Sequence, residues 1–301
     1  MFLAVSVVLC LIGCRAPPEA ESRFEFSRLA MGVEARIVLQ APSVEIAADA
    51  ADAAFAEIER LEQAFSDWRP DSELSQLSER AGSGPVPVSD DLFEILRAAS
   101  AMSVATDGAF DVTVGPLVQL WREARRTKLL PAALEIERAR ALVGWRLVEL
   151  DPDRRTIALA KAGMRLDLGG IGKGFACQRA VDLLARQGFP CALVQMGGDI
   201  VCGAPPHGRE GWEVDVGGAV RLVHDRAVAT SGDTEQHVEI DGVRYSHVVD
   251  PRTGLGLTTR SVVTITAADG TTADALAKAF GVRPERSAEW LERFPGVERW
   301  R

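Results

Sequence analysis

The chain has 301 residues, of which 47% are hydrophobic, and a formal net charge of −9. This length and apolar content are enough for a sizeable core, in one large domain or two smaller ones. The acidic balance argues against a nucleic-acid binder, which normally carries basic patches. It is compatible with one negatively charged small ligand that a few local cations hold.

The N-terminal residues predict a targeting segment that is separate from the fold. Residues 2–13 are almost wholly apolar, too few to span a bilayer as a helix, and are typical of a signal peptide. They end at Cys14, which resembles the lipidated cysteine of a bacterial lipobox. We therefore expect a signal peptide over 1–13, a lipidated Cys14 with a tether over 14–22, and one domain over 23–301. A cleaved secretory signal with an incidental cysteine is the alternative, as is a mis-assigned start.

The rest of the chain predicts helices and strands in an irregular order. Apolar residues at helical spacing, with capping residues before them, predict helices over 43–65, 90–106, 131–143, 175–187, 271–280 and 285–294. Alternating apolar residues predict two strands within 24–40 and further strands over 145–150, 156–159, 165–168, 192–195, 199–202, 212–216, 219–223, 238–240, 244–249 and 261–267. The stretches 68–87 and 109–117 predict a loop and an irregular segment. We expect an α+β (mixed α/β) domain with mixed or antiparallel sheets flanked by helices.

The most informative stretch is 165–174, in which four glycines and Lys173 follow Asp167. Glycines let the backbone approach a ligand closely, and a helix N-terminus favours a phosphate. Two known phosphate-binding patterns do not match, because Gly174 and Phe175 stand where the P-loop needs Ser or Thr and the dinucleotide pattern needs glycine. The residues alone favour another kind of phosphate loop and a tight turn with a surface lysine about equally.

Further glycine-bearing motifs occur in a fixed order along the chain, each weak by itself. Together they resemble the FAD:protein FMN transferases, the ApbE-type flavin transferases, over about residues 26–283. The motifs are Met31-Gly32, Pro70 to Ser75, Ala109-Phe110-Asp111 with Val114 to Leu117, the stretch 165–174, Gly197-Gly198-Asp199, Thr230-Ser231-Gly232, His247 with Asp250 to Gly254, and Ala273 to Ala277.

The resemblance implies an ApbE-like fold and a defined reaction. Members bind FAD and a divalent cation, usually Mg²⁺, split the FAD pyrophosphate, attach FMN to a Thr or Ser of an acceptor protein and release AMP. Many are periplasmic or lipid-anchored, which agrees with Cys14. We therefore expect a lipid-anchored protein at the periplasmic face of the bacterial cell envelope, with a subunit of a membrane redox complex as acceptor.

The resemblance also implies which residues form the site. Asp274 and the Gly170 carbonyl match metal ligands, and His247, which titrates near neutrality, is the candidate to orient substrate or take the acceptor proton. His247 and Asp274 are thus the expected catalytic residues. Plain packing is the main alternative for the apolar members of the set and for His247. The expected contacts to the flavin nucleotide are Met31, Trp68, Ala109, Phe110, Asp111, Asp167, Lys173, Asp199 and His247, with Asp199 pairing with His247 or the ligand.

One position departs from the family. Lys278 stands where the family has a threonine whose hydroxyl binds the metal, and it shares a helix face with Asp274. An ammonium group cannot ligate a cation. Either Lys278 pairs with Asp274 and occupies the cation's place, or its side chain leaves the site toward solvent. The leading function is Mg²⁺-dependent FMN transfer, and the alternatives are an FAD pyrophosphatase and an FAD-binding protein without transfer.

Overall fold

The computed structural model describes residues 21–232, 237–260 and 262–300. The expected signal peptide and Cys14 lie outside the described residues. Within these ranges, no helix combines the length and the apolar content that a bilayer span requires.

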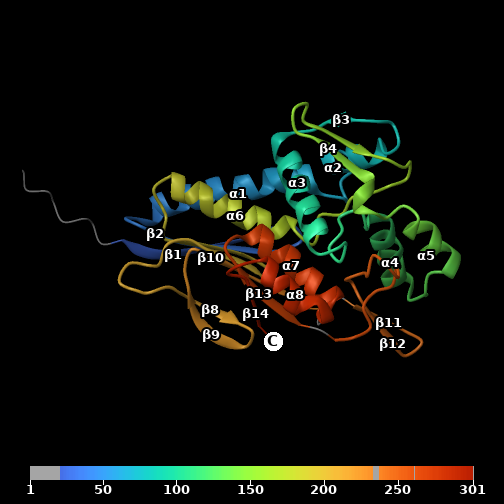
Figure 1. Ribbon diagram of the computed structural model, residues 1–301. Helices are drawn as coiled ribbons and strands as arrows, with labels where there is room; N and C mark the ends of the chain where they lie inside the picture. The colour runs from blue at the N-terminus through green and yellow to red at the C-terminus, as the bar shows by residue number, and fades with distance from the viewer. Residues whose placement is uncertain (1–20, 233–236, 261, 301) are drawn as a thin grey trace, which may run out of the picture.

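A seven-stranded sheet, antiparallel throughout, forms the centre of the fold (Figure 1). Its first two strands, which the sequence predicts within 24–40, form a hairpin, and Met31 and Gly32 in its turn both adopt positive φ angles, of 49° and 74°. In spatial order the strands are β1 (Ser22–Ala30), β2 (Val33–Ala41), β6 (Ala192–Met196), β7 (Asp199–Cys202), β10 (Arg226–Ser231), β13 (Val263–Ala267) and β14 (Glu298–Trp300).

The two faces of this sheet pack against different elements and form two separate cores. Along β2, Ile37 and Leu39 face the main core while Val38 faces a second, smaller core, as the two-residue period of a strand requires. The smaller core lies under a β-hairpin whose buried residues include Trp212 and Val214. That hairpin consists of β8 (Trp212–Val216) and β9 (Ala219–Val223).

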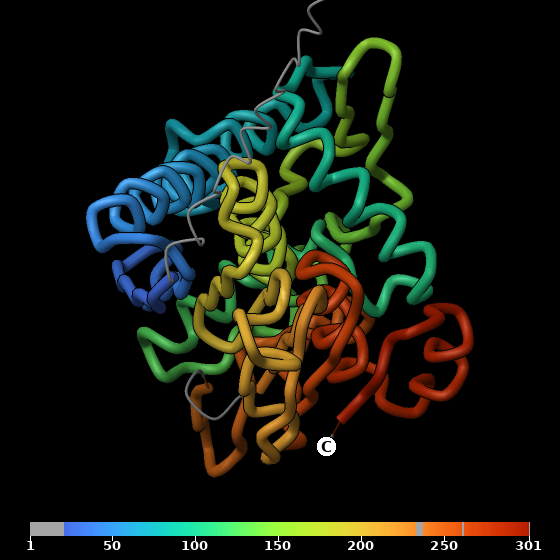
Figure 2. The backbone as a smooth tube through the Cα atoms, turned by 90° about the vertical axis from the view of Figure 1, so that its left-hand side faces the viewer, coloured from blue at the N-terminus to red at the C-terminus, as the bar shows by residue number. Residues whose placement is uncertain are grey.

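Three helices cover the main core. The first of them in the chain begins as predicted, since the Ser43 side chain accepts a hydrogen bond from the Ile46 N–H. This helix buries an alanine-rich face. Its neighbour packs against both of the others, and the first two lie side by side in Figures 1 and 2. The three are α1 (Val44–Phe65), α6 (Gly172–Arg186) and α7 (Gly270–Val282).

The remaining elements form two groups at one end of the sheet (Figure 1). One group consists of α2 (Glu73–Glu79), α3 (Asp90–Ala105) and a small sheet of β3 (Val86–Pro87), β5 (Thr156–Leu159) and β4 (Val148–Asp151), the last preceded by the 3₁₀ turn Trp145–Leu147. The other consists of α4 (Gly115–Thr127), α5 (Ala133–Arg140) and the hairpin of β11 (His237–Ile240) and β12 (Val243–Ser246), which share a core around Trp121. The chain ends with the 3₁₀ turn Pro284–Arg286, α8 (Ser287–Arg293) and β14.

The observed architecture confirms the predicted fold class, with four local corrections. Helix α2 lies inside the predicted loop 68–87, where Ser72 caps it by accepting from the Ser75 N–H. Helix α4 begins at Gly115, inside the predicted irregular segment 109–117. Pro116 lies in its first turn, where proline is tolerated. Helix α7 is capped by Asp269 rather than by a threonine. The predicted strand 165–168 is an extended segment with a single bridge, from Arg165 to Val114.

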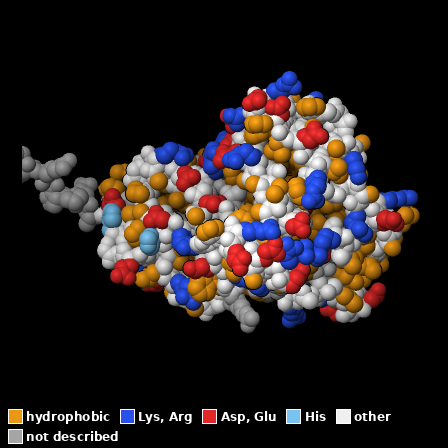
Figure 3. Space-filling model, viewed as in Figure 1, with side chains coloured by type: hydrophobic (Ala, Val, Ile, Leu, Met, Phe, Trp, Pro, Cys, Tyr) orange, Lys and Arg blue, Asp and Glu red, His pale blue; other side chains and the backbone are white. Residues whose placement is uncertain are grey.

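Charges of both signs are mixed on the face of the molecule that Figure 3 shows. On the face shown in Figure 3, lysine and arginine side chains are interspersed with aspartate and glutamate, and neither sign forms a continuous patch. Many of these groups pair at short range, as Arg60 does with Glu57 and Asp91. Specific charge clusters are therefore more informative about function here than the overall field.

Candidate active site

Gly172 and Gly174 of the glycine-rich stretch lie in the first turn of α6, and Gly169 and Gly170 precede it. The Gly172 N–H donates to the Leu168 carbonyl at 2.7 Å, so the helix begins at Gly172, three residues earlier than predicted. Just before it, Asp167 Oδ1 accepts from the Gly169 N–H at 2.8 Å. Lys173 consequently lies in the first helical turn, and its ammonium donates back to the Gly169 carbonyl at 3.3 Å.

Two glycines let α6 and α7 approach until their backbones touch. A Cβ atom added at Gly174 would lie 2.1 Å from the Gly270 carbonyl oxygen, and one added at Gly270 would lie 2.3 Å from the Gly174 oxygen. At this crossing, the Gly174 N–H donates to Asp274 Oδ2 at 3.1 Å. The close approach therefore places Asp274 of α7 beside the first turn of α6.

Four charged side chains meet at the crossing. Lys173 Nζ lies 3.1 Å from Asp199 Oδ2 and 3.8 Å from Asp274 Oδ2, and Lys278 Nζ lies 3.1 Å from Asp274 Oδ1. The Asp274 side chain is fully buried, and that of Asp199 is 4% exposed. Among the described residues, Asp199 Oδ1 is a buried atom without a hydrogen-bond partner, so it keeps its capacity to accept. We call these four residues the inner charge cluster.

The pKa values in the inner charge cluster follow from burial opposed by neighbouring charges. Burial disfavours the charged forms of Lys173 and Asp274, but opposite charges outweigh it. The carboxylates of Asp199 and Asp274 raise the pKa of Lys173, and the ammonium groups of Lys173 and Lys278 lower the pKa of Asp274. Burial and the nearby Asp274 carboxylate raise the pKa of Asp199. Lys173 and Asp274 are therefore the firmly charged members.

The resemblance predicts a magnesium ion at Gly170 and Asp274, and the side chains present do not fit one. Mg²⁺ needs oxygen ligands in near-octahedral geometry. Within the described ranges, no three His, Cys, Asp or Glu side chains are grouped to hold a metal. Both Asp274 oxygens already accept, from Lys278 and from Gly174. A doubly charged ion about 4 Å from an ammonium group would be repelled by roughly 8 kcal/mol at an effective dielectric constant of about 20.

Gly170 lies between Lys278 of the inner charge cluster and the Phe110 ring. A Cβ atom added at Gly170 would lie 3.2 Å from Lys278 Cγ and 3.3 Å from Phe110 Cε2, so only glycine fits between these two side chains without movement. The Lys278 side chain is 16% exposed. Of the two outcomes left open by the sequence, the pair with Asp274 is the one observed.

A second group of charges surrounds Arg122 on α4. Its guanidinium donates to Asp67 and, at 3.1 Å, to Asp167 Oδ2, and it stacks 4.0 Å from the centre of the Trp68 ring. Trp68 is 72% exposed, so its other face is open to solvent. Burial, then the Asp67 charge, raises the pKa of Asp167 against the opposing effect of Arg122. We call Asp67, Trp68, Arg122 and Asp167 the outer stacking group.

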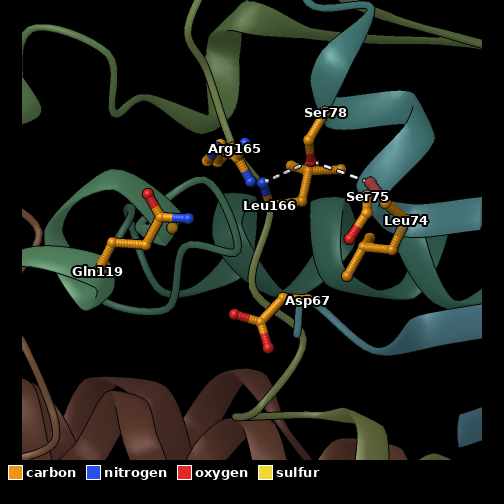
Figure 4. Close-up of a pocket in the computed structure, with 8 residues that line it drawn as sticks. Asp67, Leu74, Ser75, Ser78, Gln119, Arg165 and Leu166 are labelled. Carbon is orange, nitrogen blue, oxygen red and sulfur yellow. Dashed lines mark hydrogen bonds between the residues drawn. The ribbon is translucent and has the colours of Figure 1, made fainter. Parts of the chain in front are cut away.

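The outer stacking group borders a small hollow between α2 and α4. Figure 4 shows Asp67 and Gln119 near the segment that carries Arg165 and Leu166. This segment is fixed by the Leu166 N–H, which donates to Ser78 Oγ at 3.2 Å. The hollow is lined by Asp67, Leu74, Ser75, Ser78, Gly115, Gln119, Arg165 and Leu166.

Three predicted contact residues have structural roles in the described chain. Asp111 accepts from the Thr113 N–H and hydroxyl and from the Trp145 N–H, at 2.7 to 3.0 Å, and thereby fixes the irregular segment before α4. Burial raises its pKa against these hydrogen bonds. Ala109 is buried in the main core. Met31 occupies the β1–β2 turn, where its N–H donates to Glu62 Oε2 at 2.8 Å.

His247 lies just after β12 and is half-buried. It stands between Ser246 and Val248, which both line a second small hollow. That hollow also reaches Gly281, one turn beyond Lys278 on α7. The structure thus places the backbone on either side of His247 near the C-terminal part of the helix that carries Asp274. Asp199, for which His247 or the ligand was the predicted partner, is paired with Lys173.

Sequence reasoning missed Arg122 and Asp67. Both lie in stretches without a recognised motif, and α4 itself was not predicted. The available signal was Trp121, an apolar residue at helical spacing from Leu117, which would have predicted α4 and placed Arg122 on its surface.

Comparison with known proteins gives concordant results. The model of the ApbE family matches residues 31–300. A FAD:protein FMN transferase from Treponema pallidum is 33% identical, with 99% of this chain and 90% of that protein covered, and one from Vibrio cholerae is 32% identical, with 94% and 87% covered. In structure, a mutant of the flavin transferase ApbE from Vibrio cholerae gives a TM-score of 0.82 at 30% identity, covering 92% of this chain and 93% of that one. The ApbE protein from Thermotoga maritima gives 0.81 at 31% identity, with the same coverage.

Proposed function

Since the chain belongs to the ApbE family, we propose that it transfers FMN from FAD to a threonine or serine hydroxyl of an acceptor protein and releases AMP. The observation that carries the proposal is the position of Lys173. It is held in the first turn of α6, between two buried carboxylates and next to a second ammonium group. A pyrophosphate needs this combination of a helix N-terminus and fixed positive charge.

The two groups of the site contact different parts of FAD in this proposal. The outer stacking group offers the open face of Trp68 to an aromatic ring, with Arg122 fixing the opposite face. The ring system can be the isoalloxazine or the adenine of FAD. The inner charge cluster then faces the pyrophosphate, where Lys173 offsets negative charge. Met31, Ala109, Phe110 and Asp111 support the surrounding backbone and packing rather than supplying charge.

The reaction replaces the phosphoanhydride bond of FAD with a phosphoester bond to the acceptor. The acceptor oxygen forms a bond to the FMN phosphorus, and the bond from that phosphorus to the bridging oxygen of AMP breaks. The acceptor hydroxyl loses its proton, and AMP leaves with the electron pair of the broken bond. We assign the proton to His247, because imidazole groups titrate near neutrality and the residues on either side of His247 line a hollow that reaches α7. Asp274 acts in this scheme by fixing the two lysines.

Magnesium dependence, which the resemblance predicts, is not part of this proposal. The donors around Asp274 do not fit the ion, as described above. The flavin nucleotide contacts expected at Asp167, Lys173 and Asp199 are retained.

We also propose a location and a kind of partner. The apolar run 2–13 that ends in Cys14 supports a lipid anchor at the periplasmic face of the bacterial cell envelope. An enzyme tethered there meets the exposed domains of membrane proteins, so the proposed acceptor is a subunit of a membrane redox complex. Labelling of the protein with a radioactive fatty acid, and its loss in Cys14→Ser, tests the anchor.

Incubation of the purified protein with FAD tests the proposed function. We expect a candidate acceptor subunit to become fluorescent and to retain the flavin on a denaturing gel, with one AMP released per FMN attached. AMP and free FMN released without any acceptor would instead establish a pyrophosphatase. FAD bound without either product would establish a binding protein, and absence of FAD binding would refute the assignment altogether.

A further inference from the structure

We propose that the ammonium group of Lys278 takes the place of the divalent cation, so that this chain transfers FMN without a metal ion. The inference rests on the proposed function for its catalytic part. Its structural part, that the protein does not bind a divalent cation at Asp274, stands independently and has its own measurement.

The first support is the occupation of Asp274. This carboxylate is fully buried, with Oδ1 3.1 Å from Lys278 Nζ and Oδ2 3.1 Å from the Gly174 nitrogen. Lys173 Nζ is a further 3.8 Å neighbour of Oδ2. A metal ion bound there would have to displace an ammonium group from a buried ion pair, which leaves that charge to be accommodated elsewhere.

The second support is the charge of the inner cluster. Two ammonium groups, Lys173 and Lys278, face two carboxylates, Asp199 and Asp274, so the cluster is neutral when all four are charged. With a threonine at 278 the same cluster would carry one negative charge in a buried site. Such a site attracts a cation, whereas the neutral one does not.

The third support is that Lys278 is fixed in the site rather than extended into water. Its Cγ lies 3.2 Å from the point that a Cβ atom added at Gly170 would occupy, and its side chain is 16% exposed. Helical spacing from Asp274 keeps the pair on one face of α7. The stem therefore lies against Gly170 while the ammonium group pairs with Asp274.

An ammonium group can supply part of what a cation supplies. It carries one positive charge and up to three N–H donors, and it can donate to a phosphate oxygen while the bridging bond breaks. It requires no additional reactant, because the proton and the leaving AMP are those of the proposed transfer. The expected cost is weaker charge neutralisation than a doubly charged ion provides.

Metal binding and metal dependence are compared in the wild type and Lys278→Thr. Mn²⁺ serves as the probe, and its binding is followed by electron paramagnetic resonance at a protein concentration of about 100 μM. We expect no bound Mn²⁺ in the wild type and one bound ion in Lys278→Thr. For FMN transfer, we expect the wild type to change less than twofold between EDTA and Mg²⁺, and Lys278→Thr to require Mg²⁺, with at least a tenfold difference.

Two further variants separate the possible causes. Lys278→Met removes the charge without supplying a ligand, so we expect transfer to fall at least a hundredfold and Mg²⁺ not to restore it. Lys161→Thr is the matched control, because its ammonium lies on the surface and, within the described part of the chain, donates to the Ala141 carbonyl alone. It should behave as the wild type in both assays, and circular dichroism checks that each variant is folded.

The outcomes distinguish the inference from the proposed function. Stoichiometric Mn²⁺ binding by the wild type, or transfer that stops in EDTA and resumes with Mg²⁺, overturns the inference and leaves the proposed function intact. If no variant transfers FMN under any condition, the proposed function fails, and the Mn²⁺ measurement still decides whether Lys278 excludes the metal.

Discussion

The inner charge cluster and the outer stacking group are close enough for the Lys173 charge to oppose the rise that burial causes in the pKa of Asp167, but they are built in opposite ways. The inner cluster is buried, and α6 and α7 hold it through backbone contact between Gly174 and Gly270. The outer group rests on one guanidinium, Arg122, and leaves the face of Trp68 open.

This difference separates two physical tasks. Fixed charges act most strongly where water is excluded, so the group that faces a pyrophosphate belongs at a buried helix crossing. An aromatic ring of a ligand needs an accessible face to stack on, so the residue that binds it must remain exposed. Substitutions in the inner cluster should therefore affect stability and activity together, and those in the outer group mainly ligand affinity.

The largest effect is expected from Gly174→Ala at the helix crossing. The added Cβ would lie 2.1 Å from the Gly270 carbonyl oxygen, so the two helices must separate. We expect a loss of about 3 kcal/mol in the free energy of unfolding, measured by urea denaturation. Gly172→Ala is the matched control, because its Cβ would meet only the Leu168 Cβ, at 3.8 Å. Equal losses in both variants would show that the crossing is not closely packed.

Removal of the charge in Lys173→Met comes next. It leaves the buried Asp199 and Asp274 with less compensation, so we expect a loss of about 2 kcal/mol at pH 7 and a loss of transfer activity. The pKa of Asp199 is already raised, and a raised carboxylate pKa means that the folded state loses stability as pH rises through the interval above 3.8. The deficit should therefore shrink when urea unfolding is repeated at pH 5. Lys161→Met, on the surface, should change stability by less than about 0.5 kcal/mol at either pH.

Arg122→Met tests how far the outer group depends on one residue. It removes two ion pairs and the stacking partner of Trp68, and we expect the free energy of unfolding to fall by about 1 kcal/mol. FAD affinity, measured by equilibrium dialysis, should fall about tenfold, which corresponds to about 1.4 kcal/mol. Arg126→Met is the control on the same helix. Among the described residues Arg126 pairs with the exposed Glu123 alone, so both quantities should stay unchanged. Unaltered FAD affinity in Arg122→Met would remove this residue from the site.

Trp68→Ala should have the smallest effect on stability and still weaken binding. Its side chain is 72% exposed, so we expect the free energy of unfolding to change by less than about 0.5 kcal/mol. FAD affinity should fall about fivefold to tenfold, because the stacking face is lost. Leu29→Ala, 82% exposed on β1, is the control for removing an exposed apolar side chain. A large stability loss in Trp68→Ala would erase the proposed contrast between the two groups.

Elements with a local signal were predictable. The Met31-Gly32 turn with its flanking strands, the helix capped by Ser43, and the hairpin of β8 and β9 were all expected within a few residues of their observed bounds. Strands β10 and β14 were not predicted, because each is defined by pairing with strands distant in the sequence. The segment 165–168 shows the reverse error, since it alternates like a strand but finds only one bridging partner.

The sequence by itself identified the charged residues of the inner cluster, because the motifs around Lys173, Asp199 and Asp274 are continuous stretches of chain. It also identified Lys278 as a departure and set it on the same helix face as Asp274, since that spacing is a property of any α-helix. Only the tertiary structure decided the partners. The contact between α6 and α7 joins Lys173 to both carboxylates, and the position of Gly170 keeps Lys278 inside the site. Such pairings depend on the approach of helices far apart in the chain, which no local pattern encodes.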